Sequence, residues 1–390
     1  RIFFKTMNIP LVKNTIDNKD IDKLISWLKT YPRLTKGDMT IEFERLWSKF
    51  MGVKHSIFVN SGSSANLLMV YSLIESGILK IGDDIIIPSL SWSTSLAPAI
   101  QFGLNPILCD CNKEDLSVDL EHLESLIKER RPKCMMIVPI LGLVPQMDKI
   151  MDICEQNNVV LIEDACESLG SKFNGKQLGS FGLMSTFSTY FGHHISTIEG
   201  GMICTDDDEF ANLLKSLRSH GWARDMDTHT QEKLRKQYNV DDFNSQYTFY
   251  HTGFNLRSTD LQAFIGIGQL EKLPMVVKNR CDNFKLYYEL LDDSFWKPKL
   301  RETDYISNFA FPIIHEKRNE LVKLLNDNDI ENRPLLAGSL GKQPYWYKKY
   351  GVTKLPNVDD IDTFGLYLPN NHEMSEEEIK KVCDVLNSIV

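Results

Sequence analysis

Between residues 84 and 163 the sequence alternates short apolar runs with longer amphipathic segments, and this alternation constrains the fold more than any other feature. The apolar runs contain few polar positions, which is typical of strands buried on both faces of a sheet. The segments between them repeat apolar residues at helical spacing. Strands that alternate with helices predict an α/β fold with a mostly parallel sheet and helices on both of its faces. The predicted strands are residues 84–88, 106–110, 133–139 and 159–163, and the predicted helices are residues 93–102, 120–130 and 147–157.

Comparable patterns flank this region. Thr40 is a candidate N-cap for one of the N-terminal helices, because its hydroxyl can accept a hydrogen bond from a free backbone amide. A polar and aromatic stretch at residues 221–253 has weak periodicity, and so long a segment inside a compact domain is usually functional or ordered by a partner. The predicted elements are helices 16–29, 39–51, 61–75 and 206–219, and strands 54–60, 183–189 and 202–206.

The pattern changes in the C-terminal part of the chain, from about residue 258. A short helical pattern is followed by a long one, which we expect to bridge to a smaller α+β domain. We therefore predict a large α/β domain at residues 7–270, and the bridging helix with the small domain at residues 271–390. Residues 1–6 precede Met7 and are set aside as a candidate cloning remnant. The predicted elements are helices 261–270, 273–291, 317–328 and 375–389, and strands 306–314 and 330–334.

Composition excludes several classes of function. Of 390 residues, 42% are hydrophobic and 25% charged, as in an ordinary soluble globular protein. The net charge of −9 argues against a nucleic-acid partner, because no excess of Lys and Arg is present to neutralise phosphates. No apolar run approaches the roughly 20 residues of a membrane span, and the N-terminus lacks the apolar core of a signal peptide. We therefore expect no membrane association and a cytoplasmic location.

The eight cysteines are scattered, mostly inside apolar strand or helix patterns. This favours reduced, buried thiols over disulfides. Cys109 and Cys111 form the one close pair, and no neighbouring residues complete a four-ligand site. We therefore predict neither a metal site nor an iron–sulfur cluster.

Two stretches carry residues suited to chemistry. His193 and His194 lie between two predicted strands, where α/β folds place their active sites, although two histidines in a turn are more often simply solvated. The stretch from Ser61 to Ser64 opens a helix with a glycine and several hydroxyls, which makes an anion site. Such a stretch is weak evidence by itself, because most serine-rich helix starts are ordinary N-caps.

The stretch 190–201 reads Tyr-Phe-Gly-His-His-Ile-Ser-Thr-Ile-Glu-Gly-Gly. It resembles the active-site segment of the DegT/DnrJ/StrS sugar aminotransferases, pyridoxal phosphate enzymes of fold type I, which reads roughly Phe-Gly-Asn-Lys-Thr-Ile-Thr-Thr-Gly-Glu-Gly-Gly. The resemblance covers about residues 8–390 and implies an aspartate-aminotransferase-like large domain with a smaller C-terminal domain. His193 falls where the family has the lysine that binds the cofactor covalently. An imidazole cannot form that bond.

The resemblance also implies roles for residues elsewhere. Asp164 matches the aspartate that binds the pyridinium nitrogen of the cofactor, and Trp92 matches the aromatic residue that stacks on its ring. Glu167 would lie near the cofactor hydroxyl. Asn255 matches a residue that reaches the phosphate of the neighbouring subunit's cofactor, which implies a homodimer with shared sites. The residues expected at the phosphate within one chain are Gly62, Ser63, Ser64 and Ser188.

We expect histidine side chains to carry out catalysis. His193 is the expected base, since imidazole has an ordinary pKa near 6.5 and suits proton transfer at neutral pH. His220, in an Arg-Ser-His-Gly segment, is expected to line the site from a loop, with a helix C-terminal role as the alternative. His194 is expected to orient or pack, with a role as the base left open. The candidates for nucleotide binding are Arg224, Tyr238, Tyr247 and Tyr250, whose aromatic members dimer packing explains equally well.

A histidine in place of the lysine resembles the family's 3-dehydratases, above all those acting on GDP-4-keto-6-deoxy-D-mannose in colitose and lipopolysaccharide biosynthesis. Related CDP-linked enzymes carry cysteines for an iron–sulfur cluster after this segment, whereas Cys204, Cys281 and Cys383 here are far apart. The resemblance implies pyridoxal or pyridoxamine phosphate as cofactor and L-glutamate as amino donor. The sugar nucleotide would lose its C3 hydroxyl, and ammonia would be released. The alternatives are a sugar-nucleotide 4-aminotransferase that uses histidine, and a non-catalytic relative that binds sugar nucleotide.

Overall fold

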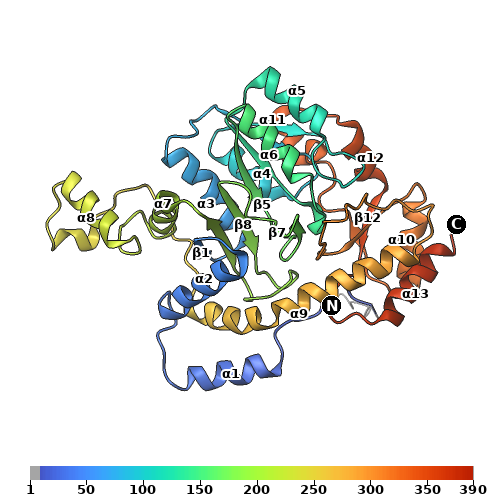
Figure 1. Ribbon diagram of the computed structural model, residues 1–390, viewed down its shortest axis with the longest axis horizontal. Helices are drawn as coiled ribbons and strands as arrows, with labels where there is room; N and C mark the ends of the chain where they lie inside the picture. The colour runs from blue at the N-terminus through green and yellow to red at the C-terminus, as the bar shows by residue number, and fades with distance from the viewer. Residues whose placement is uncertain (1–8, 390) are drawn as a thin grey trace.

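A seven-stranded sheet forms the centre of the protein in a computed structural model that describes residues 9–389 (Figure 1). The predicted remnant at residues 1–6 and the predicted domain start at residue 7 lie outside the described residues. The strand order is β1-β9-β8-β5-β4-β2-β3. The strands are β1 (His55–Val59), β2 (Asp84–Pro88), β3 (Asn105–Cys109), β4 (Cys134–Ile137), β5 (Val160–Asp164), β8 (Met184–Ser188) and β9 (Gly201–Thr205).

Strand direction brings the chemistry-bearing loops to one edge of the sheet. The run β3-β2-β4-β5-β8 is parallel throughout, which confirms the predicted mostly parallel sheet. β9 pairs antiparallel with both β8 and β1, so β1 points the same way as β8. The carboxyl ends of β1, β2, β5 and β8 therefore lie at the same edge, and the turn between β8 and β9 is at that edge too.

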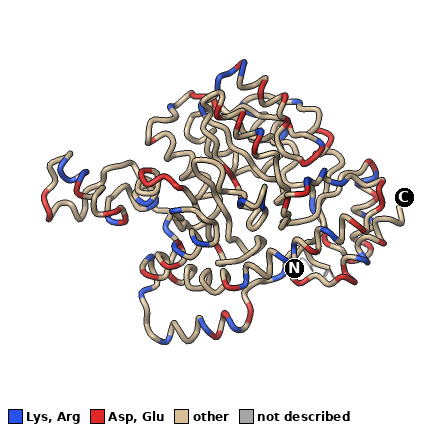
Figure 2. Tube along the Cα trace, in the orientation of Figure 1, with Lys and Arg blue, Asp and Glu red and all other residues tan. Residues whose placement is uncertain are grey.

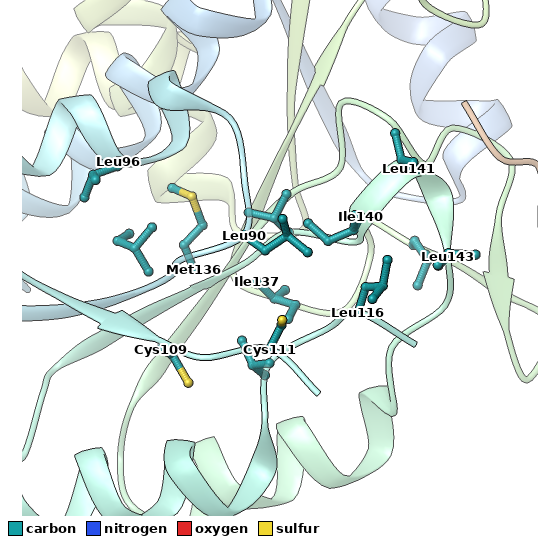
Figure 3. Packing of buried hydrophobic residues seen from close by; sticks show 14 of the residues in the cluster. Leu90, Leu96, Cys109, Cys111, Leu116, Met136, Ile137, Ile140, Leu141 and Leu143 are labelled. Carbon is teal, nitrogen blue, oxygen red and sulfur yellow. The ribbon is translucent and has the colours of Figure 1, made fainter. Parts of the chain in front are cut away.

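Helices cover the sheet as the alternating pattern predicts, because each buries an apolar stripe against it. Figure 3 shows part of the resulting core, where Leu90, Ile137 and Ile140 are packed in one buried cluster. The eight cysteines are free thiols, and seven of them are buried. The covering helices are α3 (Gly62–Glu75), α4 (Ser93–Gln101), α5 (Leu120–Arg130), α6 (Met147–Gln156) and α7 (Asp208–Arg218).

The long bridging helix differs from the prediction. Helices 261–270 and 273–291 are one continuous helix, α9 (Asp260–Leu290), which passes through Pro274. Its first half packs against α2 (Asp38–Met51) and its last turns pack against α13 (Glu376–Asn387), as Figure 1 shows. Burial along both halves outweighs the one hydrogen bond that a proline removes. The division into domains at residue 270 stays a prediction.

The C-terminal part has a three-stranded antiparallel sheet of order β10-β12-β11 with helices around it, an α+β arrangement as predicted. The predicted strands 306–314 and 330–334 are shorter in the structure. Both β12 and the two helices before it lack a clear periodic signal. The elements are β10 (Phe311–Ile314), α10 (Arg318–Asp327), β11 (Arg333–Pro334), α11 (Pro344–Tyr350), α12 (Pro356–Phe364) and β12 (Gly365–Leu368).

Residues 221–253 form an arm that projects from the body beyond α7 (Figure 1). It contains the helix α8 (Thr228–Gln237) and a short 3₁₀ turn at Asn244–Tyr247, neither of which the sequence predicted. Both signs of charge occur along it (Figure 2). No helix within residues 9–389 is long and apolar enough to cross a membrane.

The prediction that Thr40 caps α2 is wrong. The N-cap is Gly37, which has no side chain to serve as acceptor. The carboxylate of Asp260, at the start of α9, instead accepts hydrogen bonds from the amides of Gly37 (2.7 Å) and Thr40 (3.0 Å) and from the Thr40 hydroxyl (2.7 Å). A buried carboxylate from a distant helix thus satisfies the first turn of α2 and complements its dipole.

We expect Asp260→Ala to lower the free energy of unfolding by about 2 kcal/mol, because it removes a charged cap and leaves buried donors without a partner. Urea denaturation measures the change. Asp38→Ala is the matched control: Asp38 is exposed in the first turn of α2, so its removal should cost about 0.5 kcal/mol. Equal losses in the two variants would contradict this account of the cap.

Candidate active site

A cavity of about 710 Å³ opens at the carboxyl edge of the central sheet. The stretches that follow β1, β2, β5 and β8 form one side of it, as the strand directions require. The C-terminal part supplies the opposite wall. Seven of the residues predicted for the site line the cavity: Gly62, Ser63, Trp92, Asp164, Glu167, Ser188 and His193.

Asp164 ends β5, and a hydrogen-bond network fixes its carboxylate. Oδ2 accepts hydrogen bonds from Asn66 Nδ2 and Ser95 Oγ, both at 2.7 Å. Thr186 Oγ1 in turn donates to Asn66 Oδ1 at 2.6 Å, which orients the amide. Oδ1 receives a longer bond of 3.3 Å from the Cys166 amide. One carboxylate oxygen is thus held by side chains, and the other keeps capacity for a donor in the cavity.

The first turn of α3 has the geometry of an anion site. Ser61 is the N-cap, and its hydroxyl accepts from the Ser64 amide at 3.0 Å. Ser64 is therefore engaged in capping and does not line the cavity, unlike Gly62 and Ser63. A Cβ on Gly62 would lie 2.7 Å from the Cβ of Ser188, so only glycine permits this approach. The free amides at the positive end of the helix dipole favour a negatively charged group.

Trp92 precedes α4 and lines the cavity with 55% of its surface exposed. An aromatic face left open in a cavity is suited to stacking on a planar ligand. Glu167 also lines the cavity, and its Oε2 accepts a hydrogen bond from the Leu141 amide at 2.9 Å. Burial raises the pKa of Glu167 to about 8, with the charge of Asp164 adding to the effect and the Leu141 bond opposing it. At neutral pH this carboxyl group is mostly protonated.

His193 lies in the turn between β8 and β9, with its ring 5.2 Å from that of Phe309 between centroids. Its Nδ1 is buried and has no hydrogen-bond partner among the described residues. Burial, with the positive charge of Arg280 adding to its effect and a backbone hydrogen bond with Cys166 opposing it, lowers the pKa of His193 to about 4. The imidazole is therefore neutral at pH 7 and able to accept a proton.

His194 points away from the cavity and is fully buried. Its Nε2 lies 2.8 Å from the Ser307 carbonyl oxygen, which can only accept, so Nε2 carries the hydrogen and donates. Burial lowers the pKa of His194 well below its ordinary value. The placement supports the expected packing role, since this ring holds the turn against the segment before β10.

Like Ser64, the predicted residues His220 and Asn255 do not line the cavity of their own chain. They face each other across the base of the arm, where Ser219 and Asn255 form a β-bridge. Arg257 joins them: its Nε donates to Asn255 Oδ1 at 3.1 Å, and its Nη2 lies 3.4 Å from His220 Nε2. Within one chain the two groups therefore make a separate cluster.

The arm carries the four candidates for nucleotide binding. The guanidinium of Arg224 contacts the rings of Trp222 and Tyr247, at 4.3 and 4.9 Å from their centroids, and donates to the Gln246 carbonyl. Tyr238 and Tyr250 pack against each other 5.6 Å apart. None of the four lines the cavity of its own chain.

The opposite wall was missed by sequence reasoning. Arg333, in β11, is the one arginine or lysine among the described residues lining the cavity, and it pairs with Glu331. Glu331 also accepts a hydrogen bond from the Leu11 amide at 2.9 Å, which ties the N-terminal segment to this wall. Burial, with the nearby charge of Glu167, raises the pKa of Tyr367 to about 12. Arg333 and Tyr367 belong to the short strands β11 and β12. Nothing in the sequence of these strands indicates that the two side chains line the same cavity as His193.

Comparisons with known proteins place this geometry in a family. The sequence profile of the DegT/DnrJ/EryC1/StrS aminotransferase family matches residues 14–387. The GDP-4-keto-6-deoxy-D-mannose 3-dehydratase of Yersinia pseudotuberculosis is 35% identical, over 97% of this chain and 98% of that protein. The GDP-perosamine synthase of Caulobacter vibrioides is 30% identical over 96% of each.

The fold is also similar to solved structures. A crystal structure of GDP-4-keto-6-deoxymannose-3-dehydratase with a trapped PLP-glutamate geminal diamine has a TM-score of 0.89 and 32% identity, and the match covers 97% of this chain and 100% of that one. This confirms the predicted aminotransferase-like fold. The chain belongs to the DegT/DnrJ/EryC1/StrS aminotransferase family, as the sequence resemblance indicates.

Proposed function

We propose that this protein is a pyridoxal phosphate-dependent 3-dehydratase that removes the C3 hydroxyl of a nucleotide-linked 4-keto-6-deoxy sugar, with GDP-4-keto-6-deoxy-D-mannose as substrate and L-glutamate as amino donor. Two relatives named GDP-4-keto-6-deoxy-D-mannose 3-dehydratase match over 97% of this chain. The observation that carries the proposal is His193, a neutral imidazole in the cavity at the position where the family has its lysine. Deoxysugar synthesis for surface polysaccharide is the corresponding biological role.

The residues around the cavity fit the cofactor. The free amides of α3 and the close approach of Gly62 to Ser188 suit its phosphate. Asp164 suits the pyridinium nitrogen, because one of its oxygens keeps capacity for a donor. Trp92 offers a face to the ring. When bound, the cofactor supplies an amine that attaches to the C4 ketone and a ring that takes up electrons.

His193 binds no cofactor covalently and acts as the proton acceptor. A ring nitrogen takes the proton that must leave before the C3 hydroxyl of the sugar can be expelled. Because the pKa of His193 is about 4, the acceptor form prevails at neutral pH and is lost only as the pH falls through that value. Because position 193 carries no lysine amine, the chain offers no covalent anchor there, and this would favour loss of the C3 hydroxyl, with a 3-deoxy-4-keto sugar and ammonia as products, over transfer of the amine to the sugar.

Two further cavity residues suit the cofactor hydroxyl and the carboxylate of the amino donor. Glu167 is mostly protonated at neutral pH, and Leu141 occupies its Oε2, so Oε1 offers a hydrogen-bond donor toward the cofactor hydroxyl. Arg333 offers a cation to a carboxylate, and we assign it to glutamate. Both assignments follow from charge and position.

We further propose that the working unit is a homodimer. His220 and Asn255 lie beside each other but outside the cavity of their own chain, and we therefore assign them to the site of a partner subunit. The projecting arm exposes Phe243 and Tyr247 at 81% and 68%, which suits burial against a second copy. Arg224 and its stacked aromatic neighbours would then approach the nucleotide bound to the partner.

A sugar-nucleotide 4-aminotransferase remains the second candidate, because the family itself is one of aminotransferases. A neutral histidine in the cavity favours dehydration, since it keeps proton transfer without a covalent anchor. A non-catalytic relative has no need for Asp164, Trp92 and a proton acceptor in one cavity. The cytoplasmic location stays a prediction.

We expect His193→Ala to reduce the rate of dehydration by about 10²- to 10⁴-fold, the usual contribution of a positioned base, while the cofactor remains bound. Ammonia release measures the rate, and the absorbance of the bound cofactor measures occupancy. His122→Ala, a histidine on α5 outside the cavity, is the control and should keep full activity. A His193→Ala variant with near wild-type activity would sink the assignment.

Sharing of sites between subunits is tested by mixing inactive variants. If His220 serves the partner's site, subunit exchange between His193→Ala and His220→Ala gives heterodimers with one intact site, and about a quarter of wild-type activity returns. Each variant alone stays inactive. Absence of recovery, with heterodimers demonstrated by native mass spectrometry, would mean that both histidines serve the same subunit's site.

We expect Gly62→Ala to weaken pyridoxal phosphate binding by about tenfold or more, because the added Cβ meets Ser188 and displaces the phosphate cradle. Equilibrium titration followed by absorbance gives the affinity. Gly192→Ala is the matched control: Gly192 also lines the cavity, but the nearest atom to an added Cβ is 3.8 Å away. Equal affinities in the two variants would place the phosphate elsewhere.

A further inference from the structure

The first residues that the structure describes pass along the cavity and are held against the C-terminal part of the chain. The carbonyl of Ile9 accepts a hydrogen bond from the Glu331 amide at 3.0 Å. The Pro10 carbonyl accepts from Asn371 Nδ2 at 2.9 Å. The Leu11 amide donates to Glu331 Oε2, also at 2.9 Å. This segment is therefore fixed in place where it forms part of the cavity wall.

The fixed segment places Val12 against the histidine turn. Val12 and Leu11 both line the cavity. In the turn, Gly192 directly precedes His193. A Cβ added to Gly192 would lie 3.8 Å from Val12 Cγ2 and 3.9 Å from Tyr190 Cδ1. The side chains nearest to this position of the turn therefore present carbon atoms to it.

Phe309 is a second apolar side chain beside the proposed base. It lines the cavity, and its ring lies 5.2 Å from that of His193 between centroids. We call the side chains of Leu11, Val12 and Phe309 the apolar corner, since none of them has an atom that can form a hydrogen bond. A hydroxyl group placed against these side chains would lose its hydrogen bonds to water without gaining a partner, whereas a methyl group would gain from burial.

The sugar of the proposed substrate has one purely apolar substituent, which is the methyl group of C6. C6 is joined through C5 to C4, the carbon of the ketone, and C3 on the other side of C4 carries the hydroxyl that leaves. His193 must reach the reacting atoms in order to take up the proton. The methyl group is therefore confined to the neighbourhood of the base, which is where the apolar corner lies.

We propose that Val12 is a specificity-determining residue, which together with Leu11 and Phe309 receives the C6 methyl group and disfavours sugar nucleotides that carry a hydroxyl at C6. The assignment rests on the proposed function, because it uses the position of the sugar relative to His193. A hydrophobic surface rejects an added hydroxyl by a moderate factor, about 10- to 100-fold. If Val12 only packed the N-terminal segment onto the turn, its substitution would affect both kinds of sugar alike.

Two substitutions at this position change the polarity and the size of the corner. Val12→Thr keeps the branched shape of the side chain and adds a hydroxyl that can pair with a hydroxyl at C6. Val12→Ala removes apolar surface and serves as a second variant in case the threonine variant does not fold. Val138→Thr is the matched control, because Val138 also lines the cavity but directly follows β4. In the central sheet, β5 lies between β4 and β8, the strand that leads into the histidine turn.

The test is calorimetric titration of the full chain, with pyridoxamine phosphate bound, against GDP-6-deoxy-D-mannose and GDP-D-mannose. These ligands differ only at C6, and neither has the ketone that the reaction needs. We expect the wild-type protein to bind the 6-deoxy ligand about 10- to 100-fold more tightly. Val12→Thr should reduce this ratio by about fivefold, since a hydrogen-bond partner for the C6 hydroxyl becomes available. Val12→Ala should also reduce the ratio, and Val138→Thr should leave it unchanged.

Equal affinities of the wild-type protein for the two ligands, or an unchanged ratio in both Val12 variants, would overturn the proposal. Dehydration of GDP-4-keto-6-deoxy-D-mannose, measured in parallel as ammonia release, tests the proposed function separately. A preference for the 6-deoxy ligand without dehydration would refute the proposed function and leave the role of Val12 at C6 in place. Dehydration without such a preference would refute the role of Val12 alone, and absence of both binding and dehydration would refute both.

Discussion

The antiparallel pairing of β9 with both β1 and β8 is the constraint on which the site depends. It turns β1 in the direction of the parallel strands, so that the carboxyl ends of β1, β2, β5 and β8 share one edge. It also makes the link between β8 and β9 a turn at that edge, which is where His193 lies. A glycine begins β9 for a related reason: a Cβ on Gly201 would lie 2.2 Å from the Ser61 carbonyl oxygen. The anion site and the histidine turn are thus built against each other.

Burial then sets the chemistry of the groups at this edge. Removal of water lowers the pKa of His193 and raises that of Glu167, so one becomes a neutral acceptor and the other a neutral donor at the same pH. A lysine at position 193 would supply a covalent anchor as well as a base. An imidazole supplies the base alone, and this difference separates loss of the C3 hydroxyl from amine transfer in our proposal.

The resemblance to the family implied the roles of Trp92, Asp164 and Ser188. The strand pattern explains why these three residues lie together, because each follows or ends a strand and parallel strands bring such positions to one edge. Long-range contacts limited the rest. The cap of α2 comes from Asp260, which is 220 residues away from Thr40, so local capping rules chose the wrong residue. Arg333 and Tyr367 come from short strands whose position against the histidine turn depends on how the C-terminal part packs. Whether His220 and Asn255 act in the site depends on a second chain, which spacing within one chain cannot describe.

The most direct test of the account is the mass of the sugar nucleotide after the protein has been incubated with pyridoxal phosphate, L-glutamate and GDP-4-keto-6-deoxy-D-mannose, with ammonia measured in parallel. We predict a product that lacks one oxygen atom relative to the substrate, with one ammonia released for each product formed. A 4-amino sugar formed without release of ammonia would contradict this prediction and would make the protein an aminotransferase despite His193.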